Sequence, residues 1–285
     1  MADENKKITS KTFLKMKSEG QKISMLTSYD YSTAKYADES GIDSILIGDS
    51  LGMTILGYDD TVKVTMEDMI LFTSAVARGV KNALVVADMP FMSFQISKEE
   101  TLKNASKLIR AGANAVKIEG GSDFVVEQVK ALTQSGISTV AHLGFTPQYI
   151  NTIGGYFIQG KSYENTLKLL EAAKKLEKAG AFALVLELMP EEAAEYISKN
   201  LSIPTIGIGA GRFCDGQVLV VDDILGRYHA KIPKFAKQYT NLQEIIKLAI
   251  SSYNSDVKNC RFPKEDNVFK LKKEEKDKFD NALIK

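Results

Sequence analysis

Short apolar runs alternate with longer amphipathic segments along most of this 285-residue chain. Each apolar run is a few residues long and rich in Val, Ile, Leu and Ala, which is typical of parallel strands buried on both faces. Eight such strands are expected, at residues 23–27, 44–49, 84–88, 115–119, 138–142, 183–188, 204–209 and 217–221. Helices with one apolar face are expected at residues 11–20, 34–39, 66–78, 98–110, 123–135, 164–179 and 190–200.

Eight strands that alternate with helices predict an α/β fold, namely a single-domain (β/α)8 TIM barrel. An open, doubly wound sheet remains the alternative, because the number of strands alone does not prove closure. We expect an N-terminal polar segment with a helix at residues 1–22, the barrel at residues 23–263 and a charged tail at residues 264–285. A C-terminal helix is expected at residues 241–258, and the tail beyond it is expected to be a solvated helix or disordered.

Charged side chains stand where five of the predicted strands end. The strands of a parallel barrel have their carboxyl ends on one face, and barrel enzymes build their active sites there. The sequence therefore predicts an active site that contains Asp49, Asp88, Lys117, Glu119, His142 and Glu187.

Three of these residues, Asp49, Asp88 and Glu119, are acids at successive strand ends. One such acid alone is as often a helix N-cap, but three together repel one another and need a cation. Carboxylates with open positions between them suit Mg²⁺, which keeps water ligands and binds substrate oxygens. The two histidines, His142 and His229, fall on different elements, so a nitrogen-rich metal site is not expected.

Lys117 precedes Glu119 by two positions, so both side chains are expected to face the barrel interior. We expect Lys117 to hold a substrate carboxylate or a developing enolate oxygen; a Schiff-base role and a purely structural ion pair are the alternatives. Glu187 ends an apolar strand and is the candidate general base, with a structural ion pair as its alternative. His142 is expected to relay a proton or bind substrate, unless it is a satisfied core histidine.

Two glycine-containing segments lie beside predicted strand ends. Ser50 follows Asp49 directly, and its hydroxyl and backbone N–H are candidates for binding a substrate carboxylate, with helix capping as the alternative. The run at residues 207–211 resembles a nucleotide loop, but Arg212 stands where the third Gly of a GxGxxG pattern would be. We interpret that run as an anion-binding turn near the barrel mouth.

Composition narrows the class of protein further. The chain has 37 basic and 36 acidic residues, so a net charge of +1 argues against nucleic acid or an acidic membrane as a partner. Its two cysteines form no disulfide framework or CxxC pattern, which fits a reducing cytoplasm. The polar residues 1–22 do not form a signal peptide, and no apolar run is long enough to cross a membrane.

At these candidate residues the chain resembles the ketopantoate hydroxymethyltransferase family. The resemblance covers roughly residues 12–269 and rests on motifs that begin at Met25, Gly48, Ala87, Val116, His142, Gly207 and Ile232 (MLTSYDY, GDSLGM, ADMPFM, VKIEGG, HLGFTPQ, GIGAG and IPKF). The stretch at residues 227–231, which includes His229, departs from the Gly-rich form of the family, and residues 270–285 extend beyond its usual end.

This resemblance implies a (β/α)8 barrel, a Mg²⁺ site and a cytoplasmic homodecamer. It implies transfer of a one-carbon unit from 5,10-methylenetetrahydrofolate to 3-methyl-2-oxobutanoate, which gives 2-dehydropantoate at the first committed step of pantothenate and coenzyme A biosynthesis. By the same resemblance the metal ligands are Asp49, Asp88 and, directly or through water, Glu119. The oxo-acid contacts are Asp49, Ser50, Asp88 and Lys117, and the proton acceptor is Glu187, with His142 as the next candidate.

Three rival functions stay open at this point. A phosphoenolpyruvate mutase or isocitrate lyase type of enzyme uses a similar barrel, Mg²⁺ and oxo-acid enolates, but its Lys-Lys-Cys-Gly-His loop is absent here. A Schiff-base aldolase would use Lys117 as its nucleophile. A non-catalytic barrel would require all the charged strand ends to be structural together.

Overall fold

The computed structural model describes residues 7–227 and 232–282. Contacts divide the chain into two compact units, Met1–Tyr239 and Thr240–Lys285. All eight strands belong to the first unit, whereas the helix at residues 242–258 belongs to the second. This division falls earlier than residue 263, where we expected the barrel domain to end. His229, the second histidine considered above, lies outside the described residues.

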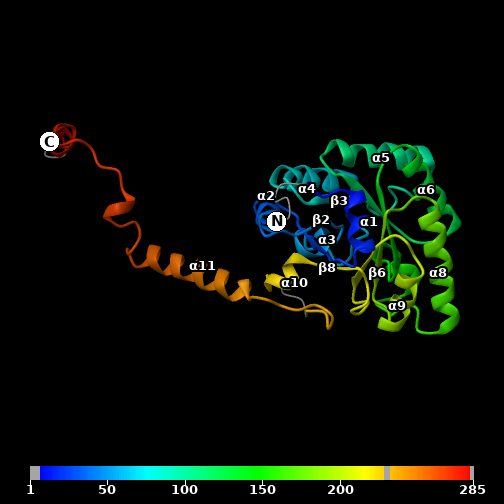
Figure 1. Cartoon of the computed structure of the whole chain (residues 1–285). Helices are drawn as coiled ribbons and strands as arrows, with labels where there is room; N and C mark the ends of the chain where they lie inside the picture. The colour runs from blue at the N-terminus through cyan, green and yellow to red at the C-terminus, as the bar shows by residue number, and fades with distance from the viewer. Residues whose placement is uncertain (1–6, 228–231, 283–285) are drawn as a thin grey trace. The chain divides into compact units, whose positions relative to one another are not determined.

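The first unit is a closed barrel of eight parallel strands, in which each strand pairs with its sequence neighbours and β1 pairs with β8 (Figure 1). Closure confirms the predicted (β/α)8 TIM barrel and excludes the open sheet. The strands are β1 (Ile23–Thr27), β2 (Ser44–Ile47), β3 (Leu84–Asp88), β4 (Ala115–Glu119), β5 (Thr139–Gly144), β6 (Ala183–Glu187), β7 (Thr205–Ile208) and β8 (Gly216–Leu219).

Seven helices match the amphipathic segments of the sequence, most of them to within a few residues. They are α1 (Ser10–Ser18), α2 (Tyr31–Glu39), α4 (Met66–Gly79), α5 (Lys98–Arg110), α6 (Asp123–Gln134), α8 (Tyr163–Lys178) and α9 (Glu191–Lys199). Most begin at a side chain that accepts a hydrogen bond from a backbone N–H of the first turn, such as Asp30 for α2 and Ser97 for α5.

Four short helical segments, all in loops that follow strand ends, did not appear in the sequence pattern. They are α3 (Leu51–Thr54), η1 (Pro147–Tyr149), α7 (Ile150–Ile153) and α10 (Val221–Leu225). A segment of three to five residues is too short to display a helical repeat of apolar positions, which is why periodicity missed them.

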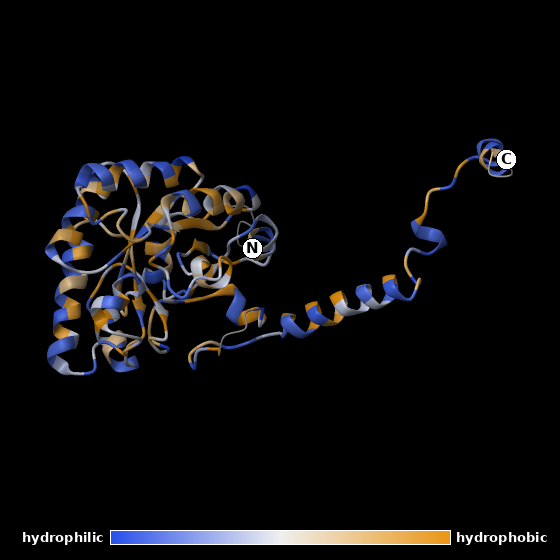
Figure 2. Ribbon diagram, turned by 180° about the vertical axis from the view of Figure 1, so that it is seen from behind, coloured by the Kyte–Doolittle hydropathy of each residue, from blue (hydrophilic) through white to orange (hydrophobic). Residues whose placement is uncertain are grey.

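Alternation along each strand separates two apolar cores. In β3, Val86 belongs to the cluster inside the barrel, whereas Val85 and Ala87 belong to the cluster between the barrel and its helices. The helices around the barrel are hydrophilic along their outer sides and apolar toward the strands (Figure 2). Because inward positions recur every second residue, a strand that ends on an inward position directs its last side chain into the barrel mouth.

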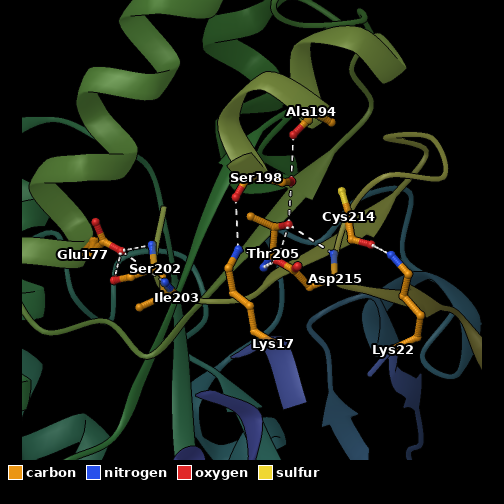
Figure 3. Close-up of polar contacts among 10 residues, drawn as sticks. All are labelled: Lys17, Lys22, Glu177, Ala194, Ser198, Ser202, Ile203, Thr205, Cys214 and Asp215. Atoms are coloured by element: carbon orange, nitrogen blue, oxygen red, sulfur yellow. Dashed lines mark hydrogen bonds and ion pairs between the residues drawn. The ribbon is translucent and has the colours of Figure 1, made fainter. Parts of the chain in front are cut away.

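The opposite, amino-terminal end of the barrel is closed by α1. Its buried Phe13 packs edge-on against Phe182, with ring centroids 5.8 Å apart, and belongs to the interior core. Lys17 of α1 donates to Asp215 at 2.8 Å and to the Ser198 carbonyl at 3.0 Å (Figure 3). The same Asp215 oxygen also accepts from the backbone N–H and hydroxyl of Thr205. These hydrogen bonds fix the N-terminal helix to β7 and to the residue that precedes β8.

The second unit contains α11 (Leu242–Lys258), η2 (Glu265–Asn267) and α12 (Lys273–Ala282). Helix α11 agrees with the predicted C-terminal helix to within one residue, and α12 occupies part of the predicted charged tail. Neither α11 nor α12 has a buried residue within the described part of the chain.

Candidate active site

A cavity of about 380 Å³ opens at the carboxyl ends of the strands. Its lining includes every residue that the sequence analysis singled out for chemistry, namely Asp49, Ser50, Asp88, Lys117, Glu119, His142 and Glu187. Five of these side chains are almost completely buried, and with the less buried Glu187 they put four carboxylates, an ammonium and an imidazole into one small volume.

Strand register explains how these side chains meet. Asp88 is paired in register with Lys117, and Glu119 is paired with His142, so each pair lies side by side on neighbouring strands. At the next strand, Gly144 has a φ of +95°, and a Cβ there would overlap the backbone carbonyl of Glu187. Only glycine permits this close approach of β5 to β6 beside the candidate base.

Lys117 is the central cation of the pocket. Its Nζ lies 3.1 Å from Asp88 Oδ1, 3.6 Å from Glu119 Oε1 and 3.3 Å from His142 Nδ1. Burial opposes the charged form, but Asp88, Glu119 and Asp49 together raise the pKa of Lys117 above its ordinary value. Lys117 is therefore an ammonium at neutral pH, available to a negatively charged oxygen.

His142 links Glu119 to Glu187. Its Nδ1 lies 3.2 Å from Glu119 Oε1, and its Nε2 lies 3.2 Å from Glu187 Oε2. Burial and the nearby Lys117 oppose protonation, but Glu119 and Glu187 outweigh them and raise the pKa of His142 to about 9. His142 therefore carries a positive charge at neutral pH, and its Nε2 faces Glu187 without the angles of a hydrogen bond.

Burial is the main reason that both aspartates of the pocket have raised pKa values. Burial, Asp88 and Glu119 raise the pKa of Asp49 well above its ordinary range, with Lys117 opposing. Burial also raises the pKa of Asp88, and Glu119 adds to it, although Lys117 opposes this strongly. The backbone N–H of Asp49 donates to Asp88 Oδ2 at 3.0 Å, which keeps the two residues together.

These residues fit a hard divalent cation. Asp88 Oδ1 is buried and has no hydrogen bond, although the Lys117 ammonium lies within ion-pair distance of it. Among the described residues, no group of three or more His, Cys, Asp or Glu side chains forms a preassembled metal cage. A site with two carboxylates that leaves its other positions to water and substrate is the arrangement that Mg²⁺ favours.

Gln148 is a site residue that the sequence analysis missed. Its side chain donates to Asp49 Oδ2 at 2.8 Å and to the Met89 carbonyl at 2.9 Å, and its backbone N–H donates to Glu119 Oε2 at 3.1 Å. It therefore positions two of the three acids. Gln148 lies in the long connection after β5, and an amide in a loop has no periodic signal that would reveal it.

Tyr29 is a second buried residue that the analysis overlooked. Its hydroxyl lies 2.7 Å from Ser50 Oγ, and burial raises the pKa of Tyr29 above its ordinary value, so the phenol stays neutral. Gly48 makes room for this arrangement, because a Cβ there would lie 2.7 Å from Ser50 Oγ. The Ser50 hydroxyl is thereby held at the edge of the pocket.

The glycine-rich turn after β7 contributes less than expected. Ile208 lines the pocket, but Arg212 makes a two-pronged ion pair with Glu191 at 2.8 and 2.9 Å. The guanidinium next to the predicted anion-binding turn therefore already has a carboxylate partner.

A closed parallel barrel with its charged side chains gathered at the carboxyl ends of the strands is the architecture of a (β/α)8 barrel enzyme. The sequence model of the ketopantoate hydroxymethyltransferase family matches residues 7–265. The chain belongs to that family.

Relatives and solved structures agree with this assignment. The chain is 54% identical over 266 residues to 3-methyl-2-oxobutanoate hydroxymethyltransferase of Clostridium novyi (strain NT), covering 93% of this chain and 96% of the relative. It is 53% identical over 268 residues to the protein of the same name from Bacillus cereus (strain B4264), covering 94% and 96%. No helix in the described ranges has both the length and the apolar character needed to cross a bilayer.

Two solved structures share the fold at low identity. A phosphonopyruvate hydrolase in complex with oxalate and Mg²⁺ has a TM-score of 0.56 at 12% identity, with 97% of each chain covered. An oxaloacetate acetylhydrolase bound to 3,3-difluorooxalacetate has a TM-score of 0.58 at 13% identity, with 93% of this chain and 91% of that chain covered. Likeness at this level supports the barrel architecture alone.

Proposed function

We propose that this enzyme transfers a one-carbon unit from 5,10-methylenetetrahydrofolate to 3-methyl-2-oxobutanoate, with consumption of water, to give 2-dehydropantoate and tetrahydrofolate. This reaction is the first committed step of pantothenate and coenzyme A biosynthesis. The observation that carries the proposal is the gathering of Asp49, Ser50, Asp88, Lys117, Glu119, His142 and Glu187 around one pocket in a chain of this family.

Mg²⁺ is the proposed cofactor; Asp49 and Asp88 would hold it, together with Glu119 directly or through water. When bound, the ion supplies positive charge that polarises the ketone of the oxo acid. The Glu119 oxygens contact His142 and the backbone N–H of Gln148, which fix this carboxylate in the pocket.

Ser50 and Lys117 are the proposed contacts of the oxo acid, along with the two aspartates. The Ser50 hydroxyl, held by Tyr29, donates to the substrate carboxylate. The Lys117 ammonium stabilises the negative charge that develops on the keto oxygen when the enolate forms. Its neighbours Asp88 and Glu119 hold the ammonium in a fixed position, so little reorganisation is needed during the reaction.

Glu187 is the proposed base. It takes the proton from C3 of the oxo acid, and the electron pair of that C–H bond becomes the enolate. The C3 carbon then bonds to the methylene carbon of the folate as both bonds from that carbon to the folate nitrogens N5 and N10 break. Water supplies the hydroxyl oxygen, and the proton from C3 and one proton from water end on the two nitrogens of tetrahydrofolate. His142 lies 3.2 Å from Glu187 Oε2 and supplies a positive charge beside the carboxylate.

The Schiff-base alternative conflicts with the electrostatics of Lys117. A nucleophilic lysine must lose its proton, but three carboxylates raise the pKa of Lys117. Borohydride treatment in the presence of the oxo acid is expected to leave the protein mass unchanged. A covalent adduct at Lys117 would show that the aldolase mechanism is right.

The direct test is to incubate the protein with 3-methyl-2-oxobutanoate in D₂O and follow the C3 proton by NMR, with and without Mg²⁺ and with no folate. Metal-dependent loss of that signal above the buffer rate is the expected result. A protein that binds the metal and the oxo acid but neither exchanges the proton nor completes the reaction with methylenetetrahydrofolate does not have this function. Carbon–carbon cleavage of an oxo acid without folate would instead support a lyase of the isocitrate lyase type.

We also propose a cytoplasmic homo-oligomer, a decamer by the family resemblance. Helix α11 supports self-association because it exposes Ile245, Leu248, Ile250 and Tyr253, an apolar set that water solvates poorly. Light scattering coupled to gel filtration measures the mass; a monomer at micromolar concentration would contradict this part of the proposal.

A further inference from the structure

The catalytic pocket has two chemically different halves. The inner half holds the buried charged side chains. Each of the following is at most 5% exposed: Asp49, Asp88, Lys117, Glu119 and His142. The outer half is lined by apolar side chains that reach toward solvent, namely Met53, Pro147, Tyr156, Ile208, Val220, Pro233 and Phe235. A small oxo acid that binds the charged half leaves this apolar half uncovered.

Aromatic rings dominate the outer half. Tyr156 is 59% exposed and Phe235 is 38% exposed, although both line the pocket. The Tyr156 ring packs on buried Phe145 with centroids 4.9 Å apart, and its hydroxyl lies 4.0 Å from the sulfur of Met53. Large exposed rings that are held in place at the edge of a cavity suit a flat ligand that stacks on them.

Asp223 is the carboxylate of this outer half. It belongs to α10, just after β8, and is half-buried at the pocket wall. Asp223 has no side-chain hydrogen bond or ion pair within the described residues. Each of the other carboxylates that line the pocket contacts a partner side chain, namely Asp49, Asp88, Glu119 and Glu187. Burial and the neighbouring Asp222 raise the pKa of Asp223, as expected for a carboxyl without a donor.

We infer that the outer half binds the reduced pterin ring of the one-carbon carrier and that Asp223 accepts hydrogen bonds from its ring N–H and exocyclic amino group. This inference rests on the proposed function and identifies where the carrier sits. Two adjacent N–H donors match the two oxygens of a carboxylate, as in an arginine–carboxylate pair. The planar ring stacks on Tyr156 or Phe235, and its one-carbon unit then shares a cavity with the oxo acid.

The test compares Asp223→Asn with the wild-type enzyme, because this change keeps the shape and removes the charge and one acceptor. We expect the dissociation constant of tetrahydrofolate and the KM for methylenetetrahydrofolate to rise about 10- to 100-fold, which is the effect of losing a charged hydrogen-bond partner. The KM for the oxo acid is expected to stay within about twofold. Tyr156→Leu is expected to weaken tetrahydrofolate in the same direction, by about 3- to 10-fold.

The matched control is Asp59→Asn, which changes an exposed aspartate outside the pocket and is expected to alter neither constant. Unchanged carrier binding in Asp223→Asn, or an equal rise in the oxo-acid KM, would overturn the inference. The inference would also be overturned if the wild-type enzyme exchanged the C3 proton of the oxo acid but did not bind tetrahydrofolate. In that case the proposed chemistry on the oxo acid would still stand. Wild-type enzyme that binds tetrahydrofolate but exchanges no proton and forms no product would count against the proposed function instead.

Discussion

The two ends of the barrel hold their charged side chains in different ways. At the amino-terminal end, Lys17 and Asp215 form a 2.8 Å ion pair, and Thr205 and a carbonyl oxygen complete its hydrogen bonds (Figure 3). At the carboxyl end, Asp88 Oδ1 and His142 Nε2 are buried without a hydrogen bond. The barrel therefore has a well-paired polar cluster at its amino-terminal end and a pocket with polar atoms that lack hydrogen bonds at its carboxyl end.

This difference separates stability from function. A polar group that is fully paired within the protein has nothing left to offer a ligand, and its loss leaves partners buried and unpaired. Carboxylates crowded around a pocket cost stability until a cation or substrate arrives, so their presence indicates binding rather than folding. Variants at each end are expected to show this division directly.

The largest expected effect is on turnover at the carboxyl end. Glu187→Gln removes the proposed base and is expected to lower kcat roughly 10²- to 10⁴-fold, because a positioned base contributes about that factor. Binding of Mg²⁺ and the oxo acid, followed by calorimetry, is expected to change little. A variant that keeps most of its rate would show that the base lies elsewhere, with His142 as the next residue to test.

The next effect is on folding at the amino-terminal end. Asp215→Ala leaves Lys17 and the backbone N–H of Thr205 without their shared acceptor. The free energy of unfolding, measured by urea titration, is expected to fall by about 2–3 kcal/mol, below the value for a fully buried pair because these side chains are partly exposed. The kcat of the folded enzyme is expected to stay unchanged; a large loss of kcat would contradict the division between the two ends.

A smaller effect of the opposite sign is expected for Asp49→Asn. Because the pKa of Asp49 is raised in the folded protein, the fold favours the protonated carboxyl over the carboxylate. This stabilisation is lost as the pH rises through the folded-state pKa, so the ionised carboxylate is unfavourable in the metal-free protein. The variant is expected to be more stable than wild type by about 1 kcal/mol at pH 8 without metal, and to lose Mg²⁺ binding. Destabilisation of the metal-free protein would contradict the idea that these acids await a cation.

The mildest test changes only the pH. His142 has a pKa raised to about 9, so its stability contribution is complete below its unfolded pKa of about 6.5 and is lost as pH rises through about 9. NMR of the imidazole resonances in metal-free protein is expected to show this titration, with His142→Gln to assign it. Added Mg²⁺ is expected to lower this pKa, since a nearby cation disfavours the imidazolium. A midpoint near 6.5 without metal would contradict the described contacts.

Local pattern predicted much of the fold because buried strands and amphipathic helices have short-range signatures. The eight apolar runs became eight strands, although β2 ends at Ile47 rather than at residue 49, because Gly48 and Asp49 turn into α3. The period of two along β4 also predicted that Lys117 and Glu119 share a face, which requires no knowledge of the neighbouring strands.

Tertiary structure decided what depends on residues far apart in the chain. Pairing of β1 with β8 closed the barrel, and folding of the long connection after β5 brought Gln148 to Asp49, 99 positions away. The sequence alone determined which elements form and which side chains stand at strand ends, because those properties are set by neighbours along the chain. The closure of the barrel and the ion pair between Lys117 and Asp88 Oδ1 were decided only when distant strands met, because hydrogen bonds and charge effects depend on distances in space.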